Sequence, residues 1–181
     1  MPHVTMSPDL KPGTPGLMAY RPETGRPLSQ LAEVLLRDAH SLSRADRELI
    51  AARVSALNDC KFCLYTHSEV SAQQHPEGRG MVDKILADPA GAPTPKLKAL
   101  LTIAEAASES GHSVTEEMVA DARKEGATDT EIHDTVLIAA AFCMYNRYCD
   151  GLAAVVPDDP AAYVPMAAMI IREGYSTCAT G

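Results

Sequence analysis

Apolar positions along the chain repeat at the three- and four-residue spacing of amphipathic helices, and no stretch alternates strongly with a period of two. Residues 28–40 show the pattern, with Leu31, Val34 and Leu35 on one face. Cap residues divide the remaining chain into further predicted helices at residues 44–57, 60–75, 80–87, 95–110, 115–124, 129–156 and 159–172. The pattern predicts an all-α helical bundle with about seven or eight helices.

The chain of 181 residues is long enough for one domain with a sizeable core. Residues 1–27 are rich in proline and glycine, which disfavour regular helices. We therefore expect residues 1–27 to form an irregular N-terminal arm. Residues 28–173 are expected to form a single helical domain, and residues 174–181 a frayed C-terminal tail.

The net charge of the chain limits the classes of partner that it is expected to bind. A net charge of −8 and the absence of a basic stripe disfavour nucleic acid and anionic membranes. The longest apolar run, residues 136–145, is too short to cross a bilayer, and the first residues contain no apolar signal segment. These features predict a cytoplasmic protein, in which a CxxC pair is redox-active or binds metal rather than forming a structural disulfide.

Candidate chemistry lies in residues 60–67, Cys-Lys-Phe-Cys-Leu-Tyr-Thr-His. On a helix, positions 60, 63 and 67 fall at about 0°, 300° and 340° around the axis, so Cys60, Cys63 and His67 share one face. Both cysteines lie in the first turns of the predicted helix, whose positive end stabilises a thiolate. Helical side chains lean toward the N-terminus, which brings His67 back over Cys63. A thiol pair beside a base suits reversible sulfur redox chemistry.

A carboxylate from the preceding helix is predicted to join this face. If residues 44–57 and 60–75 form an antiparallel hairpin, the midpoint of positions 48 and 67 falls on the turn between them. Glu48 then lies at the height of His67, and the small residues Ala52 and Ser55 let the helices approach. In this interpretation Glu48 orients His67, and His67 takes the proton of a cysteine.

These residues resemble a known family. Glu48 followed by Cys60-x-x-Cys63-x-x-x-His67 is similar to the signature of the alkylhydroperoxidase AhpD-like proteins of the carboxymuconolactone decarboxylase superfamily. Residues 128–134 and 146–152 resemble its peroxidase-related branch. The sequence departs from the family at Phe62, where well-studied AhpD proteins have a histidine.

The resemblance implies a helical peroxidase, an antioxidant oxidoreductase without haem, flavin or metal, that assembles as a homo-oligomer, a trimer or hexamer. Cys63 would attack the peroxide and Cys60 would close a redox-active disulfide with it. A dithiol reductant, a lipoyl or thioredoxin-like protein, would restore the thiols. Glu48, Cys60, Cys63 and His67 are therefore the predicted catalytic residues.

Two alternatives stay open at this point. Phe62 in place of histidine is compatible with a thiol-disulfide oxidoreductase that is indifferent to peroxides. The chain is also compatible with a non-catalytic helical oligomer in which Cys60, Cys63 and His67 supply three ligands to a structural zinc ion. The other cysteines are assigned no role in either case: Cys143 and Cys149 are expected to be buried small apolar residues, and Cys178 to be incidental in the tail.

Overall fold

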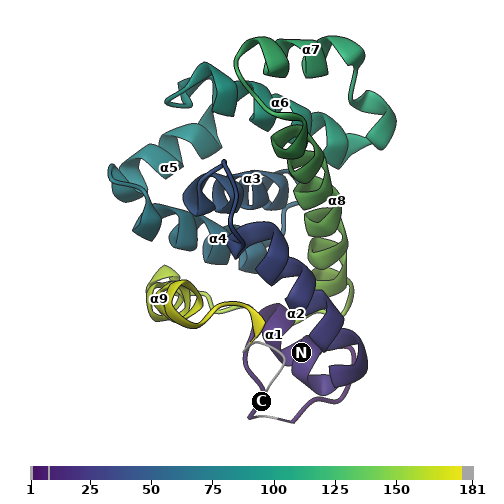
Figure 1. Ribbon diagram of the computed structural model, residues 1–181. Coiled ribbons are helices and arrows are strands. Elements are labelled where there is room, and N and C mark those ends of the chain that lie inside the picture. Colours follow the sequence, from purple (N-terminus) through teal and green to yellow (C-terminus); the bar gives the residue numbers. More distant parts are fainter. Residues whose placement is uncertain (1, 8, 177–181) are drawn as a thin grey trace.

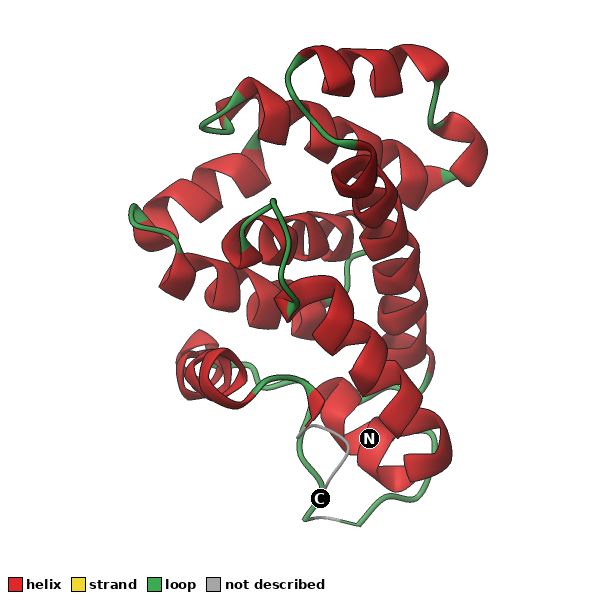
Figure 2. Ribbon diagram, viewed as in Figure 1, coloured by secondary structure: helices red, strands yellow, loops and turns green. Residues whose placement is uncertain are grey.

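A computed structural model describes residues 2–7 and 9–176, and within them the chain forms nine α-helices and no strand (Figures 1 and 2). The predicted all-α class is confirmed, with slightly more helices than expected. Cys178 and the end of the predicted tail lie outside the described residues. No helix in the described part of the chain has both the length and the apolarity needed to traverse a membrane.

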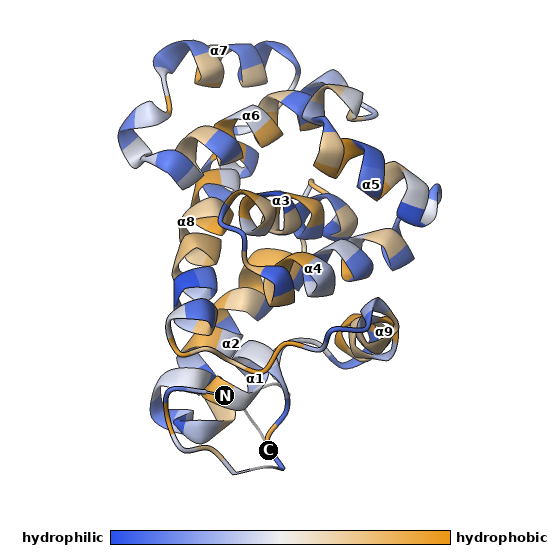
Figure 3. Ribbon diagram, turned by 180° about the vertical axis from the view of Figure 1, so that it is seen from behind, coloured by the Kyte–Doolittle hydropathy of each residue, from blue (hydrophilic) through white to orange (hydrophobic). Residues whose placement is uncertain are grey.

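The centre of the molecule is a helical hairpin of α3 (Arg44–Leu57) and α4 (Lys61–Gln74), which lie side by side in both views (Figures 1 and 3). Ser43 caps α3, because its side chain accepts a hydrogen bond from the Asp46 N–H. Asp59 adopts a left-handed φ of 55° in the turn, and Cys60 is the N-cap of α4. The hairpin predicted from the sequence is therefore present.

The remaining helices surround this hairpin. The long helix α8 packs against both α3 and α6, whereas α9 packs against α4 (Figure 1). Helix α8 ends earlier than predicted, because Ala153 takes a φ of 48° just beyond it. The bounds are α5 (Gly78–Ala87), α6 (Pro95–Glu109), α7 (Glu116–Lys124), α8 (Asp129–Gly151) and α9 (Tyr163–Glu173).

The N-terminal residues differ from the prediction. Residues 13–27 are not irregular, because they form α1 (Gly13–Tyr20) and the start of α2 (Pro22–Arg37). Pro22 is tolerated in the first turn of α2, where its missing N–H leaves no helical bond unmade. Gly25 lies against the backbone of Met18, and a Cβ there would fall 2.2 Å from the Met18 carbonyl oxygen. The glycines that suggested a loop thus allow close packing of two helices.

Two apolar clusters fill the interior, and hydrophobic positions face inward across the bundle (Figure 3). The larger cluster joins α2, α3, α6 and α8. The smaller one lies at the start of α4 and consists of Leu17, Cys60, Phe62, Cys63, Cys149, Ala154 and Tyr163. The cysteine pair is therefore surrounded by apolar side chains, where an isolated charge is costly.

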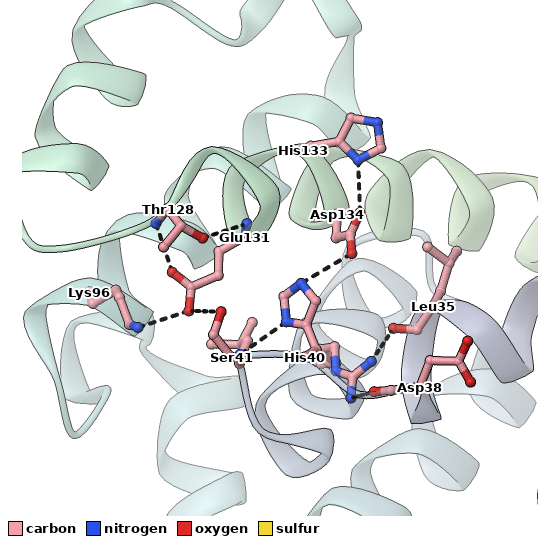
Figure 4. A network of polar contacts seen from close by, with 11 residues as sticks. Leu35, Asp38, His40, Ser41, Lys96, Thr128, Glu131, His133 and Asp134 are labelled. Carbon is pink, nitrogen blue, oxygen red and sulfur yellow. Dashed lines mark hydrogen bonds and ion pairs between the residues drawn. The ribbon is translucent and has the colours of Figure 1, made fainter.

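The first turn of α8 is held by a buried carboxylate, Glu131 (Figure 4). Thr128 and Glu131 form the capping box predicted by their spacing. Oε1 of Glu131 also accepts hydrogen bonds from Lys96 Nζ and Ser41 Oγ, both at 2.9 Å. These contacts fix α8 to the loop between α2 and α3 and to the first turn of α6, and so help to position the helix that carries Cys149.

Replacing Glu131 by glutamine is expected to lower the free energy of unfolding by about 2–4 kcal/mol at pH 7, because Lys96 loses its buried partner. Burial raises the pKa of Glu131, but the bonds from Thr128, Lys96 and Ser41 outweigh it and hold the pKa at about 2. The stabilisation is complete above the ordinary pKa of 4.5 and is lost as the pH falls toward 2. Urea unfolding at pH 7 and pH 3 measures the free energy of unfolding of both proteins. The difference between wild type and variant should be smaller at pH 3 than at pH 7. Equal stabilities at pH 7 would contradict the prediction.

Candidate active site

The two cysteines of the CxxC motif open α4. Cys60 is its N-cap, and the backbone N–H of Cys60 donates to the Ser55 carbonyl at 3.0 Å, which ties the turn to α3. Cys63 lies in the first turn of the helix. Both side chains are buried, with relative exposures of 0% and 2%. The positive end of α4 favours a thiolate there.

Glu48 and His67 meet across the hairpin, as the sequence arithmetic predicted. Nδ1 of His67 lies 2.7 Å from Oε2 of Glu48, and both side chains are buried. A carboxylate at this distance accepts the Nδ1 proton, so that Nε2 is left as the acceptor of the neutral ring. The pair therefore has the geometry of an oriented base.

Tyr175 is a site residue that the sequence analysis missed. Its hydroxyl donates to Oε1 of Glu48 at 2.7 Å, and its ring stacks on His67 at a centroid distance of 5.9 Å. The Tyr175 N–H also donates to Oε2 of Glu33 at 2.6 Å, which fixes this segment against α2. Residues 174–175 are thus ordered against the site. No local pattern signals this, because the contact spans more than a hundred positions of chain.

Cys149 is the second residue that was missed. Its Sγ atom and those of Cys60 and Cys63 all lie within 4.8 Å of one another. The expectation that Cys149 is buried is correct, but it considered only pairing with Cys143 on the same helix. In the described residues the cluster that could hold a metal ion consists of these three thiols, and His67 is not a member of it.

The pKa values of the three thiols are shifted in different directions. Hydrogen bonds from Cys149 and Cys63 lower the pKa of Cys60 far below that of a free thiol, against the opposing effect of burial. Hydrogen bonding with Cys149 and with Cys60, together with burial, raises the pKa of Cys63. Burial and the charge of Cys60 raise the pKa of Asp150 to about 7. Cys60 is therefore the most acidic of the three thiols.

A small cavity of about 40 Å³ lies beside this cluster. Cys63 is the only cysteine among its described lining residues, and His67 and Thr66 supply polar groups to its wall. The rest of the lining is largely apolar and comes from α1, α2, α8, α9 and the C-terminal segment. The space admits a molecule of roughly the size of water or a small peroxide.

Phe62 occupies the position where the family signature has histidine. Its side chain is 2% exposed, and its ring lies 6.0 Å from that of Tyr163. A Cβ at Gly13 would fall 2.1 Å from this ring, so α1 begins with glycine where it passes Phe62. Phe62 thus seals the thiols beneath α1 and adds no proton carrier.

Comparison with known proteins agrees with this architecture. The model of the carboxymuconolactone decarboxylase family matches residues 22–75, which include Glu48 and both cysteines of the motif. No curated protein matches the sequence.

Three solved structures are similar over most of the chain. One is the alkylhydroperoxidase AhpD core of an uncharacterized peroxidase-related protein from Ralstonia eutropha JMP134, with a TM-score of 0.72, 25% identity, and coverage of 83% of this chain and 78% of that one. An uncharacterized peroxidase-related protein from Silicibacter sp. TM1040 has a TM-score of 0.75 and 23% identity over 84% and 78% of the two chains. A protein of unknown function from Agrobacterium tumefaciens, ATU0492, has a TM-score of 0.67 and 20% identity over 77% and 94%.

Proposed function

Because the chain belongs to the AhpD-like proteins of the carboxymuconolactone decarboxylase superfamily, we propose that it is a cysteine-based peroxidase that reduces small hydroperoxides. Cys63 is the attacking residue, Cys60 resolves the product, and Glu48 and His67 manage the proton. The observation that carries the proposal is the buried 2.7 Å contact between Glu48 and His67, next to a cavity whose wall includes Cys63.

The first step removes the proton of Cys63. The proton passes to His67 Nε2 on the cavity side, because Cys63 and His67 line the same cavity. Glu48 stabilises the imidazolium that forms, since its carboxylate accepts the Nδ1 proton. The Cys63 thiolate then attacks the terminal oxygen of the peroxide and the O–O bond breaks. His67 returns the proton to the leaving alkoxide or hydroxide, which leaves as an alcohol or water.

The second step resolves the sulfenic acid on Cys63. The Cys60 thiol attacks it, the S–S bond forms as the S–O bond breaks, and the hydroxyl departs as water with the proton of Cys60. A dithiol donor then reduces this disulfide by two successive exchanges. Burial of both cysteines favours a slender donor of the lipoyl type over a cysteine on a folded thioredoxin-like surface.

Burial also favours peroxides over bulky disulfides as the oxidising substrate. A general thiol-disulfide oxidoreductase must expose one sulfur to its partner, whereas Cys60 and Cys63 have exposures of 0% and 2%. A peroxide needs only the small cavity beside Cys63. The replacement of histidine by Phe62 therefore changes proton supply more than it changes the class of substrate.

Quantification of thiols before and after one equivalent of hydrogen peroxide tests the proposal. Two thiols should disappear for each peroxide consumed, about the ratio that disulfide formation requires. Mass mapping should show Cys60 and Cys63 among the oxidised positions. Peroxide that leaves every thiol free, or that oxidises only Cys143, would contradict the proposed function.

A further inference from the structure

We propose that Cys149 is a third redox thiol of this centre: it forms a disulfide with the sulfenic acid on Cys63 as an alternative to Cys60. The inference deepens the proposed function and rests on it, because the sulfenic acid is the product of the peroxidase step. It gives the centre two resolving cysteines on two different helices, α4 and α8.

Proximity is the first argument. The three Sγ atoms lie within 4.8 Å of one another, and all three residues are buried. Sulfurs at this separation need side-chain rotation and a small backbone adjustment to reach the disulfide length of about 2.05 Å. The backbone beside Cys149 can adjust, because α8 ends at Gly151 and Ala153 is already in a left-handed turn.

A polar contact one turn earlier holds Cys149 in register with the pair. Asn146 Nδ2 donates to Ser55 Oγ at 3.1 Å, and Asn58 Nδ2 donates to Asn146 Oδ1 at 2.9 Å. Asn146 is 1% exposed, so these bonds are shielded from water. They fasten α8 to the α3–α4 turn and thereby fix Cys149 next to the N-cap of α4.

Cys143, which also lies on α8 but outside the group of three sulfurs, provides a comparison for Cys149. It lies six positions earlier on the same helix and is only partly buried, and its Sγ donates to the Ser108 carbonyl at 3.6 Å. The Sγ atom of Cys149 instead lies within 4.8 Å of the sulfurs of Cys60 and Cys63, in the apolar cluster that contains the pair. A cysteine serving only as apolar filling has no need of sulfur partners.

The chemistry balances without any further reagent. The sulfur of Cys149 attacks the sulfenic sulfur of Cys63, the S–S bond forms as the S–O bond breaks, and the Cys149 proton leaves with the hydroxyl as water. The thiolate of Cys60 can then attack Cys63 and release Cys149, an exchange with no net oxidation. One disulfide is therefore shared among three sulfurs, and the remaining thiol stays beside it.

The same three sulfurs also match the donor set of a soft cation such as Zn²⁺, which binds thiolates at about 2.3 Å. However, Asp150 lies nearby and apolar side chains surround the three sulfurs. Three thiolates there would bury several negative charges in one place, which favours thiols without a metal ion.

The test oxidises the full-length protein with one equivalent of hydrogen peroxide, blocks free thiols and maps the linkages by mass spectrometry. Wild type should yield Cys60–Cys63 together with a linkage that includes Cys149. Cys60→Ser should still lose two thiols per peroxide and form Cys63–Cys149. Cys60→Ser/Cys149→Ala should stall at the sulfenic acid, with at least about tenfold more sulfinic acid in excess peroxide. Cys143→Ala is the matched control and should behave as wild type.

Several results would overturn the proposal. Wild type without any Cys149 linkage, or Cys60→Ser with Cys63 as a sulfenic acid beside a free Cys149, would each do so. So would stoichiometric zinc that blocks oxidation until it is chelated and that Cys149→Ala releases. If peroxide oxidises no thiol in wild type, the proposed function fails instead. A parallel oxidation with diamide then decides about Cys149, because it forms disulfides without peroxide.

Discussion

Replacing Cys63 by serine is expected to reduce peroxide turnover by roughly 10³-fold or more, the scale seen when a catalytic nucleophile is removed. A serine hydroxyl remains protonated where a thiol ionises, and its oxygen cannot form a sulfenic acid. The exchange is nearly isosteric, so serine should keep the packing of the apolar cluster that contains Cys63. Peroxide consumption with dithiothreitol as the reductant measures the effect.

Cys143→Ser is the control for this experiment. It makes the same chemical change on a cysteine whose Sγ contacts the Ser108 carbonyl and the Asn58 side chain, and serine can keep both contacts. The control should turn over at the wild-type rate. Wild-type turnover in Cys63→Ser, with the fold confirmed by circular dichroism, would rule out the assigned mechanism.

Glu48→Gln is expected to lower turnover by about 10²-fold, the lower end of what general acid–base catalysis contributes. The amide can donate to Nδ1 of His67, which then holds the opposite tautomer and presents Nε2–H to the cavity in place of a lone pair. The imidazolium also loses the carboxylate that stabilises it. Steady-state rates at saturating reductant measure the loss.

Tyr175→Phe is the matched comparison for Glu48→Gln. It removes the hydroxyl that donates to Oε1 of Glu48 but leaves the carboxylate on Nδ1 of His67. We expect it to lose much less activity than Glu48→Gln. Equal losses in the two variants would show that burial of the site, rather than the charge of Glu48, determines the rate.

Much of the fold and the contact between Glu48 and His67 could be predicted because they depend on local geometry. Cap residues such as Ser43 and Thr128 fix helix starts through bonds to the next turn. The contact between Glu48 and His67 followed from the antiparallel hairpin, because a short turn fixes the register of both helices. Such features can be predicted from the few residues that surround each cap or turn.

The features that were missed depend on packing between distant parts of the chain. Cys149 and Tyr175 reach the site from segments far beyond α4, and no spacing rule connects them to Cys60 or Glu48. The N-terminal helices were missed for a different reason. Glycine and proline normally break helices, but here Gly25 permits a close approach and Pro22 occupies a first turn.

The pH dependence of a single turnover tests the central claim most directly. Thiol oxidation by hydrogen peroxide is followed in wild type and in Glu48→Gln, with no reductant present. If the carboxylate prepares the imidazole to take the proton of Cys63, the variant should be slower, and its half-maximal rate should move about one pH unit or more toward alkaline conditions. Superimposable rate profiles for the two proteins would contradict the account.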